Sequence, residues 1–239
     1  MLICKFEVDK NAYGISACNA RVFACLVQVN ASDSILSILA EINDNSWIAK
    51  LGIVEQISYQ ARLQSTAKSI MDDCIKFNDD SGVNIYDYSV VGEYIVSKEG
   101  RKALTEQFSH APVPLAELWK EKKSGNPGFD YHSESQTSLL IFGEAKYNST
   151  ANPYSDAIDQ VEGFIDSGKD RMELVDLKNF VSQTAVQNFI SGKKGFSIAF
   201  SIHSQTPKTI INNAIKYQNA NNIASYDEYY IVGVQINDQ

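Results

Sequence analysis

Residues 138–147 of the chain read Ser-Leu-Leu-Ile-Phe-Gly-Glu-Ala-Lys-Tyr, and this stretch decides how the second half of the chain folds. A short apolar run bounded by polar residues is typical of a buried β-strand. Because side chains alternate along a strand, Glu144 and Lys146 are expected to project side by side from one face of its end. The stretch therefore predicts an acid and a base held together at the end of a buried strand.

A second acid precedes this strand. Residues 129–133, which begin Phe-Asp, are also predicted to be extended, and the connection over residues 134–137 is short enough for a β-hairpin. Such a hairpin would bring the carboxylate of Asp130 across from Glu144. Two carboxylates and one backbone carbonyl supply the oxygen ligands that Mg²⁺ prefers while it keeps several waters. The hairpin thus predicts a site for Mg²⁺ or Mn²⁺.

Such a site would suit phosphodiester hydrolysis. A divalent metal polarises a phosphate and lowers the pKa of a bound water, and Lys146 would place positive charge beside the reacting phosphate. A Glu-x-Lys pair alone is usually a solvated ion pair, and the chain contains another in Glu121-Lys122-Lys123. The buried strand, the preceding aspartate and Gly143, which allows close approach, distinguish Glu144 and Lys146 from that polar segment.

The rest of the chain alternates between helical and extended patterns. Helices are predicted over residues 35–42, 54–77, 92–108, 115–120, 155–167, 173–190 and 208–221, and further strands over residues 22–29, 83–86, 195–203 and 228–236. This order predicts an α/β fold, with a mixed β-sheet flanked by helices over residues 86–239. Residues 1–85 are expected to form an N-terminal α+β extension that covers the core or docks a partner.

The composition of the chain predicts its location in the cell. Hydrophobic residues make up 44% of the 239 residues, which is enough for a full core. No apolar stretch approaches the roughly 18 residues of a membrane span, and the first residues do not resemble a secretory signal. Because the four cysteines include no C-x-x-C pair, they are expected to be reduced and mostly buried in a cytoplasmic protein.

The net charge of −8 excludes a protein that coats nucleic acid through a broad basic face. It leaves room for a nuclease, because clustered carboxylates become a cationic site once they bind a divalent metal. Substrate engagement is therefore expected to be local, to depend on the metal, or to be provided by a partner.

From Gly92 to its C-terminus, the chain resembles the PD-(D/E)xK nuclease superfamily in the order of its elements and in the motif Gly128-Phe129-Asp130 … Gly143-Glu144-Ala145-Lys146. The resemblance implies a restriction-endonuclease-like fold and hydrolysis of DNA. It also implies that Asp130, Glu144 and the carbonyl of Ala145 bind the metal, and that Lys146 is the catalytic lysine.

The same resemblance implies two further residues. Many members of the superfamily add an acid from the helix ahead of the sheet, and Glu93 matches best, with Glu117 as second choice. Some members place a glutamine on the helix after the lysine strand, a position that Gln160 fits. A solvated glutamate and an ordinary polar helix position are the alternatives for these residues.

More narrowly, the chain is similar to the HamA family of nuclease subunits from bacterial Hachiman antiphage systems. That resemblance implies an effector that cuts DNA and is restrained by a superfamily 2 helicase partner, HamB. Two other functions remain open from the sequence: a sequence-specific restriction endonuclease, and an interaction subunit that keeps the nuclease fold without its activity.

Overall fold

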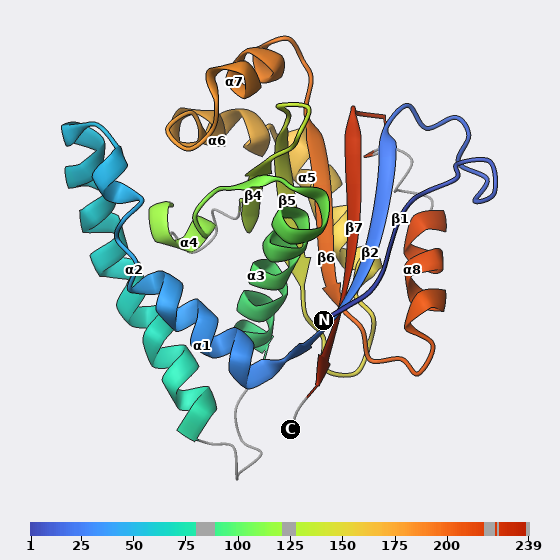
Figure 1. The fold of residues 1–239 in the computed structure, drawn as a ribbon, viewed down its shortest axis with the longest axis horizontal. Coiled ribbons are helices and arrows are strands. Elements are labelled where there is room, and N and C mark those ends of the chain that lie inside the picture. The colour runs from blue at the N-terminus through green and yellow to red at the C-terminus, as the bar shows by residue number, and fades with distance from the viewer. Residues whose placement is uncertain (80–88, 121–127, 218–222, 224, 238–239) are drawn as a thin grey trace.

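The computed structural model describes residues 1–79, 89–120, 128–217, 223 and 225–237 (Figure 1). These residues form one seven-stranded sheet, whose strands in spatial order are β1 (Leu2–Glu7), β2 (Arg21–Asn30), β7 (Glu228–Asn237), β6 (Gly195–Ser201), β5 (Leu140–Lys146), β4 (Tyr131–Glu134) and β3 (Ala111–Pro112). The four central strands β2, β7, β6 and β5 run parallel to one another. The strands at the two ends of the sheet, β1 on one side and β4 and β3 on the other, pair antiparallel. The predicted mixed sheet of an α/β fold is confirmed.

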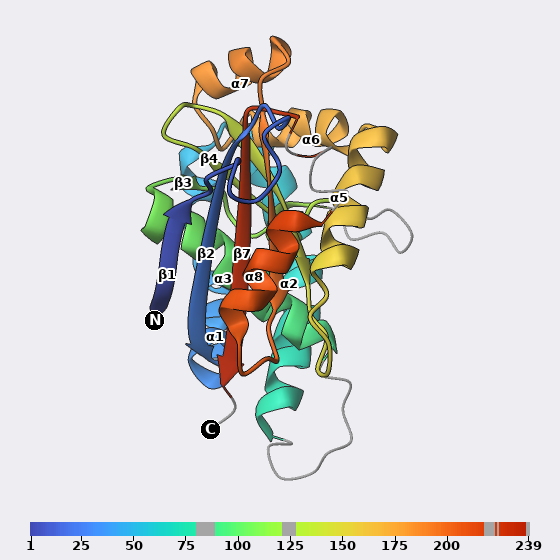
Figure 2. The same cartoon turned by 90° about the vertical axis from the view of Figure 1, so that its right-hand side faces the viewer.

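Helices cover both faces of the sheet (Figures 1 and 2). On one face α3 (Ser89–Phe108) packs against the strands, and α1 (Ala31–Ile42) and α2 (Ile53–Asp79) pack on α3. The other face is covered by α5 (Tyr154–Ser167) and α8 (Pro207–Lys216). Within the described residues, none of the helices combines the length and the apolarity needed to cross a membrane.

The central strands are apolar because both of their sides are covered. On β6, Phe196, Ile198 and Phe200 join the larger core cluster, whereas Ala199 belongs to the smaller cluster that includes side chains of α3. Parallel strands buried on both faces are expected to carry such continuous apolar runs. None of the four cysteines forms a disulfide, and all but Cys4 are buried, as predicted.

The N-terminal strands belong to the same sheet as the acidic hairpin. Along its full length β2 pairs with β7, from Arg21 beside Glu228 to Asn30 beside Asn237. Residues 1–30 therefore complete the central sheet. The domain boundary expected between residues 85 and 86, and the extended piece expected over residues 83–86, lie outside the described residues.

The single helix predicted over residues 173–190 is wrong. Two helices, α6 (Lys169–Leu177) and α7 (Gln183–Ile190), occupy this region. In the break between them Phe180 packs against the rings of Trp47 and Trp119, with centroids 5.6 and 5.7 Å away. Ser182 then caps α7 by accepting a hydrogen bond from the backbone of Ala185 at 3.1 Å. Tertiary packing and a local cap thus interrupt the helical pattern.

Beside the hairpin the sheet has one more antiparallel strand, where the sequence predicts only the two strands of the hairpin. The short strand β3 pairs with Ser133 and Glu134 at the end of the sheet. Pro112 has no backbone N–H to donate to a further strand, which suits its place on the edge strand of the sheet. The remaining helical segments are α4 (Ala116–Trp119) and a 3₁₀ turn over Ile48–Lys50.

Candidate active site

The β4–β5 hairpin forms as predicted and places Asp130 beside the end of β5. Tyr131, the first residue of β4, pairs with Gly143, and the backbone N–H of Asp130 donates to the Gly143 carbonyl at 2.8 Å. Asp130 itself precedes β4. Its side chain bonds the next backbone group of β5, because Oδ2 of Asp130 accepts the backbone N–H of Ala145 at 2.8 Å.

Lys146 lies between two acids. Its Nζ is 2.9 Å from Oε1 of Glu144 and 3.7 Å from Oε1 of Glu93, which projects from α3. The Glu144 side chain is 1% exposed and the Glu93 side chain 48%. The ammonium group therefore joins a buried acid at the end of the strand to a largely solvated acid on the helix.

Burial is the main influence on both carboxyl groups of the hairpin. It raises the pKa of Asp130 to about 6, against the opposing effects of the Ala145 amide, Lys146 and Lys120. Burial also raises the pKa of Glu144 well above its usual range, and the neighbouring charge of Asp130 adds to the effect. Repulsion between the two acids is therefore a smaller cause of the raised pKa of Glu144 than burial.

The lysine keeps its charge in this setting. Burial lowers the pKa of Lys146, but the adjacent carboxylate of Glu144, together with Asp130 and Glu93, outweighs it, so the net shift is upward. A positively charged ammonium group is therefore held at the site.

The donor groups fit a divalent cation. Oε2 of Glu144 is buried, and within the described residues it has no hydrogen-bond partner. A buried carboxylate oxygen without a donor is costly, and a cation would satisfy it. In a strand the carbonyl of a residue points to the same side as its N–H, so the Ala145 carbonyl faces the Asp130 side as well. Asp130, Glu144 and this carbonyl form an oxygen-rich corner.

A three-acid site is not formed. Among the residues that the structure describes, no three histidine, cysteine, aspartate or glutamate side chains come together as a group that could hold a metal ion. Glu93, expected as a third acidic ligand, is paired with Lys146 instead. Asp130 and Glu144 are the two acids of the hairpin, and they lie close enough for one to influence the ionisation of the other.

The other two candidates are placed differently. Gln160 is half-buried on α5, and in the described part of the chain no hydrogen bond or ion pair joins it to Asp130, Glu144 or Lys146. Glu117 is half-buried on α4. The ion pair with Lys146 favours Glu93 over Glu117 as the helix acid of this site.

Gly143 serves packing on the opposite face of the strand. A Cβ atom added there would lie 2.2 Å from the ring of Tyr131. The hydroxyl of that tyrosine lies 2.7 Å from Oγ of Ser197 on β6, which fixes the ring across β5. The close approach expected at this glycine is therefore made by a tyrosine side chain.

Sequence reasoning missed a buried polar group next to Asp130. Glu173 of α6 lies 2.6 Å from Nζ of Lys120 and 2.7 Å from Nε2 of His132. Only tertiary structure unites these residues, so their spacing gave no signal. Lys122 and Lys123, in the polar segment that precedes Asp130 along the chain, lie outside the described residues.

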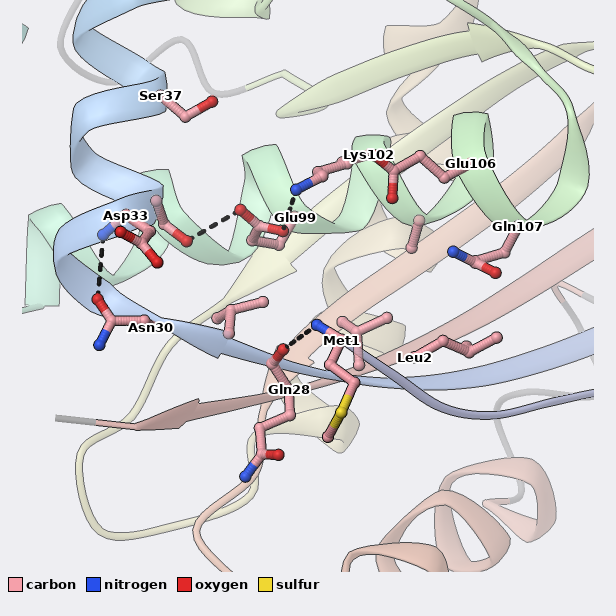
Figure 3. Close-up of a pocket in the computed structure, with 14 residues that line it drawn as sticks. Met1, Leu2, Gln28, Asn30, Asp33, Ser37, Glu99, Lys102, Glu106 and Gln107 are labelled. Atoms are coloured by element: carbon pink, nitrogen blue, oxygen red, sulfur yellow. Dashed lines mark hydrogen bonds and ion pairs between the residues drawn. The ribbon is translucent and has the colours of Figure 1, made fainter. Parts of the chain in front are cut away.

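A cavity of about 210 Å³ lies elsewhere, between the N-terminus, α1 and α3 (Figure 3). Several of its polar groups are paired: the Met1 ammonium group donates to the Gln28 carbonyl at 2.5 Å, and Ser34 donates to Glu99 at 2.9 Å. None of the predicted site residues lines this cavity.

Comparisons with protein-family models, curated proteins and solved structures found no match to this chain. The geometry of Asp130, Glu144 and Lys146 is therefore the basis on which a function is inferred.

Proposed function

We propose that the chain is a metal-dependent nuclease of restriction-endonuclease-like fold that hydrolyses DNA phosphodiester bonds at Asp130, Glu144 and Lys146. The observation that carries the proposal is the buried Glu144, which holds Lys146 at 2.9 Å through one oxygen while its other oxygen has no donor among the described residues. A bound cation would offset the negative charge of two carboxyl groups that are buried close together.

Each residue has a distinct role in this proposal. Asp130, Glu144 and the carbonyl of Ala145 would hold Mg²⁺ or Mn²⁺, which supplies polarisation of the phosphate and an acidified water when bound. Lys146 stabilises the negative charge that develops on the phosphate oxygens. Glu93 orients the lysine from its exposed side.

The charge of the chain supports a partner that delivers the substrate. The net charge is −8, and two of the lysines that the structure describes are engaged by acids: Lys120 by Glu173 and Lys194 by Asp170. This balance is compatible with an effector subunit of an antiphage defence system that a helicase restrains and supplies with DNA.

Plasmid cleavage in Mg²⁺ or Mn²⁺ tests the activity. The variant Glu144→Ala with Lys146→Ala is expected to abolish cleavage, whereas Glu7→Ala with Arg21→Ala, which removes a surface ion pair, retains it. Undiminished cleavage by the first double variant contradicts the assignment. Discrete bands from a long DNA would identify a sequence-specific restriction endonuclease.

One observation favours a second function, an interaction subunit without activity. The described residues form no three-acid group, and Lys146 is engaged by Glu144 and Glu93. Calorimetric titration with Mn²⁺ separates the two functions, because an active site binds the metal and Asp130→Asn weakens that binding. A chain that takes up no Mn²⁺ supports the interaction subunit.

A further inference from the structure

The residue before Asp130 has both of its backbone polar groups bonded by charged side chains. The N–H of Phe129 donates to Oε1 of Glu173 at 3.0 Å, and its carbonyl accepts a hydrogen bond from Nζ of Lys120. Lys120 and Glu173 are themselves joined at 2.6 Å. We call this arrangement of Lys120, Glu173 and the Phe129 backbone the Phe129 clamp.

Glu173 also holds the chain on the other side of Asp130. Its Oε2 lies 2.7 Å from Nε2 of His132, whose side chain is fully buried. One side chain of α6 thus contacts the residue before Asp130 and the residue two positions after it. The segment that carries the aspartate is fixed from both directions.

The sheet provides only part of this support. Phe129 and Asp130 precede the first residue of β4, so they lie beyond the regular ladder of the hairpin. The backbone N–H of Asp130 donates to the Gly143 carbonyl. The Asp130 carbonyl accepts, among the described residues, only a long hydrogen bond from Ser97, at 3.4 Å. Because buried backbone groups need partners, the clamp replaces the strand here.

Gly128 makes room for the clamp. A Cβ atom at this position would lie 2.3 Å from Oε1 of Glu173 and 3.1 Å from Nζ of Lys120. A side chain in place of this glycine, which opens the Gly-Phe-Asp motif, would therefore meet the two charged side chains that approach it.

We propose that Lys120 and Glu173 are positioning residues that hold the Asp130 carboxylate against the Ala145 amide and beside Glu144. The consequence for metal binding rests on the proposed function, whereas the position of the carboxylate does not. Neither residue touches the reacting groups; both act through the backbone of Phe129, and Glu173 acts through His132 as well.

The chain offers a matched control. Lys194 forms a similar ion pair with Asp170, which lies on the same helix α6 and has a side chain that is 1% exposed. Lys194 directly precedes Gly195, which pairs with Ile141, so this ion pair lies by the opposite end of β5 from Ala145. Lys194→Met therefore removes a comparable ion pair away from Asp130.

Amide hydrogen exchange tests the clamp without metal. In Lys120→Met, the Ala145 amide is expected to exchange about tenfold faster, because its acceptor on Asp130 is no longer held in place. Lys194→Met should leave this rate within about twofold of the wild type. An unchanged Ala145 rate in Lys120→Met, or equal acceleration in both variants, overturns the proposal. If Lys120→Met does not fold, Gly128→Ala, which displaces the clamp by steric contact, takes its place.

Calorimetric titration with Mn²⁺ on the same proteins separates the two proposals. If the wild type binds Mn²⁺, Lys120→Met should weaken binding about tenfold and Lys194→Met less than about twofold. A wild type that does not bind Mn²⁺ refutes the nuclease function, and the exchange of Ala145 then decides the clamp. Normal Mn²⁺ binding by the wild type with unchanged Ala145 exchange in Lys120→Met refutes the clamp alone.

Discussion

Asp130 and Glu144 are two carboxyl groups buried close together, where ionisation is unfavourable for both. Glu144 is 1% exposed, and the pKa values of both carboxyl groups lie above their usual range, chiefly through burial. Lys146 offsets part of this cost at Glu144, and the Ala145 amide offsets part of it at Asp130. Without a cation, the site is therefore a place where negative charge destabilises the fold.

Asp130→Asn is expected to stabilise the protein without metal. The pKa of Asp130 in the fold is about 6, above the roughly 3.9 of an unfolded aspartate. The protonated side chain therefore contributes to the stability of the fold at a pH below about 3.9, and this contribution is lost as the pH rises through 6. Asparagine has no charge but still accepts the Ala145 N–H. At pH 7.5 in a chelator, urea unfolding should give a free energy about 1–2 kcal/mol higher for the variant. A difference between the proteins that is the same at pH 4 and pH 7.5 contradicts this explanation.

Mn²⁺ binding should be steeply pH-dependent for the same reason. A metal binds the ionised carboxylate, so below a pKa of about 6 the proton on Asp130 competes with it. Affinity measured by calorimetry should fall by at least about tenfold per pH unit below 6, because Glu144 must lose a proton as well, and level off above the pKa values of the site. A flat affinity between pH 5 and 7 indicates that Asp130 is not a ligand.

At the residue scale, the sequence predicted the acids and the lysine, but not their supports. Alternation along a strand is enough to place Glu144 with Lys146, and a short hairpin is enough to add Asp130. Lys120 and Glu173 meet only through the packing of α4 and α6 on the hairpin. Local sequence carries no record of such a contact.

At the scale of elements, the β4–β5 hairpin is the unit that creates the site. Its strands follow from short apolar runs, and its pairing follows from the short connection between them. The split between α6 and α7 was missed because a helical period continues through a region that Phe180 draws into an aromatic cluster. Periodicity reports a helical face, but the packing of one ring determines where the helix ends.

Gly143→Ala should destabilise this hairpin. The new Cβ would meet the Tyr131 ring at 2.2 Å, and such overpacking typically costs about 1–3 kcal/mol. Gly163→Ala on α5 is the matched control, because nothing lies within 4 Å of its Cβ position. In a helix interior that change should stabilise by about 0.5–1 kcal/mol. If urea denaturation gives both variants the same stability, Tyr131 does not constrain Gly143.

At the scale of the whole molecule, the two N-terminal strands are part of the central sheet. In β2, Ala24, Cys25 and Leu26 are fully buried, and the strand separates the antiparallel edge β1 from β7. The sequence predicted β2 as a strand but assigned it to an extension. Sheet order depends on contacts between distant segments, and a strand pattern alone does not specify its neighbour.

Removal of residues 1–30 should therefore abolish cooperative folding. The truncated chain would expose the edge of β7 and the side chains of both core clusters that β2 covers. Calorimetry is expected to show no cooperative thermal transition for residues 31–239, in contrast to the full chain. A cooperative transition with retained Mn²⁺ binding in the truncated protein contradicts this view.

The central claim is that Asp130 and Glu144 form a metal site that serves phosphodiester hydrolysis. Calorimetric titration of Mn²⁺ into the wild type and Glu144→Gln tests it most directly, because a partner that restrains cleavage need not prevent metal binding. We expect the wild type to bind Mn²⁺ and Glu144→Gln to bind it at least about tenfold more weakly. No binding by the wild type, or equal binding by both proteins, contradicts the claim.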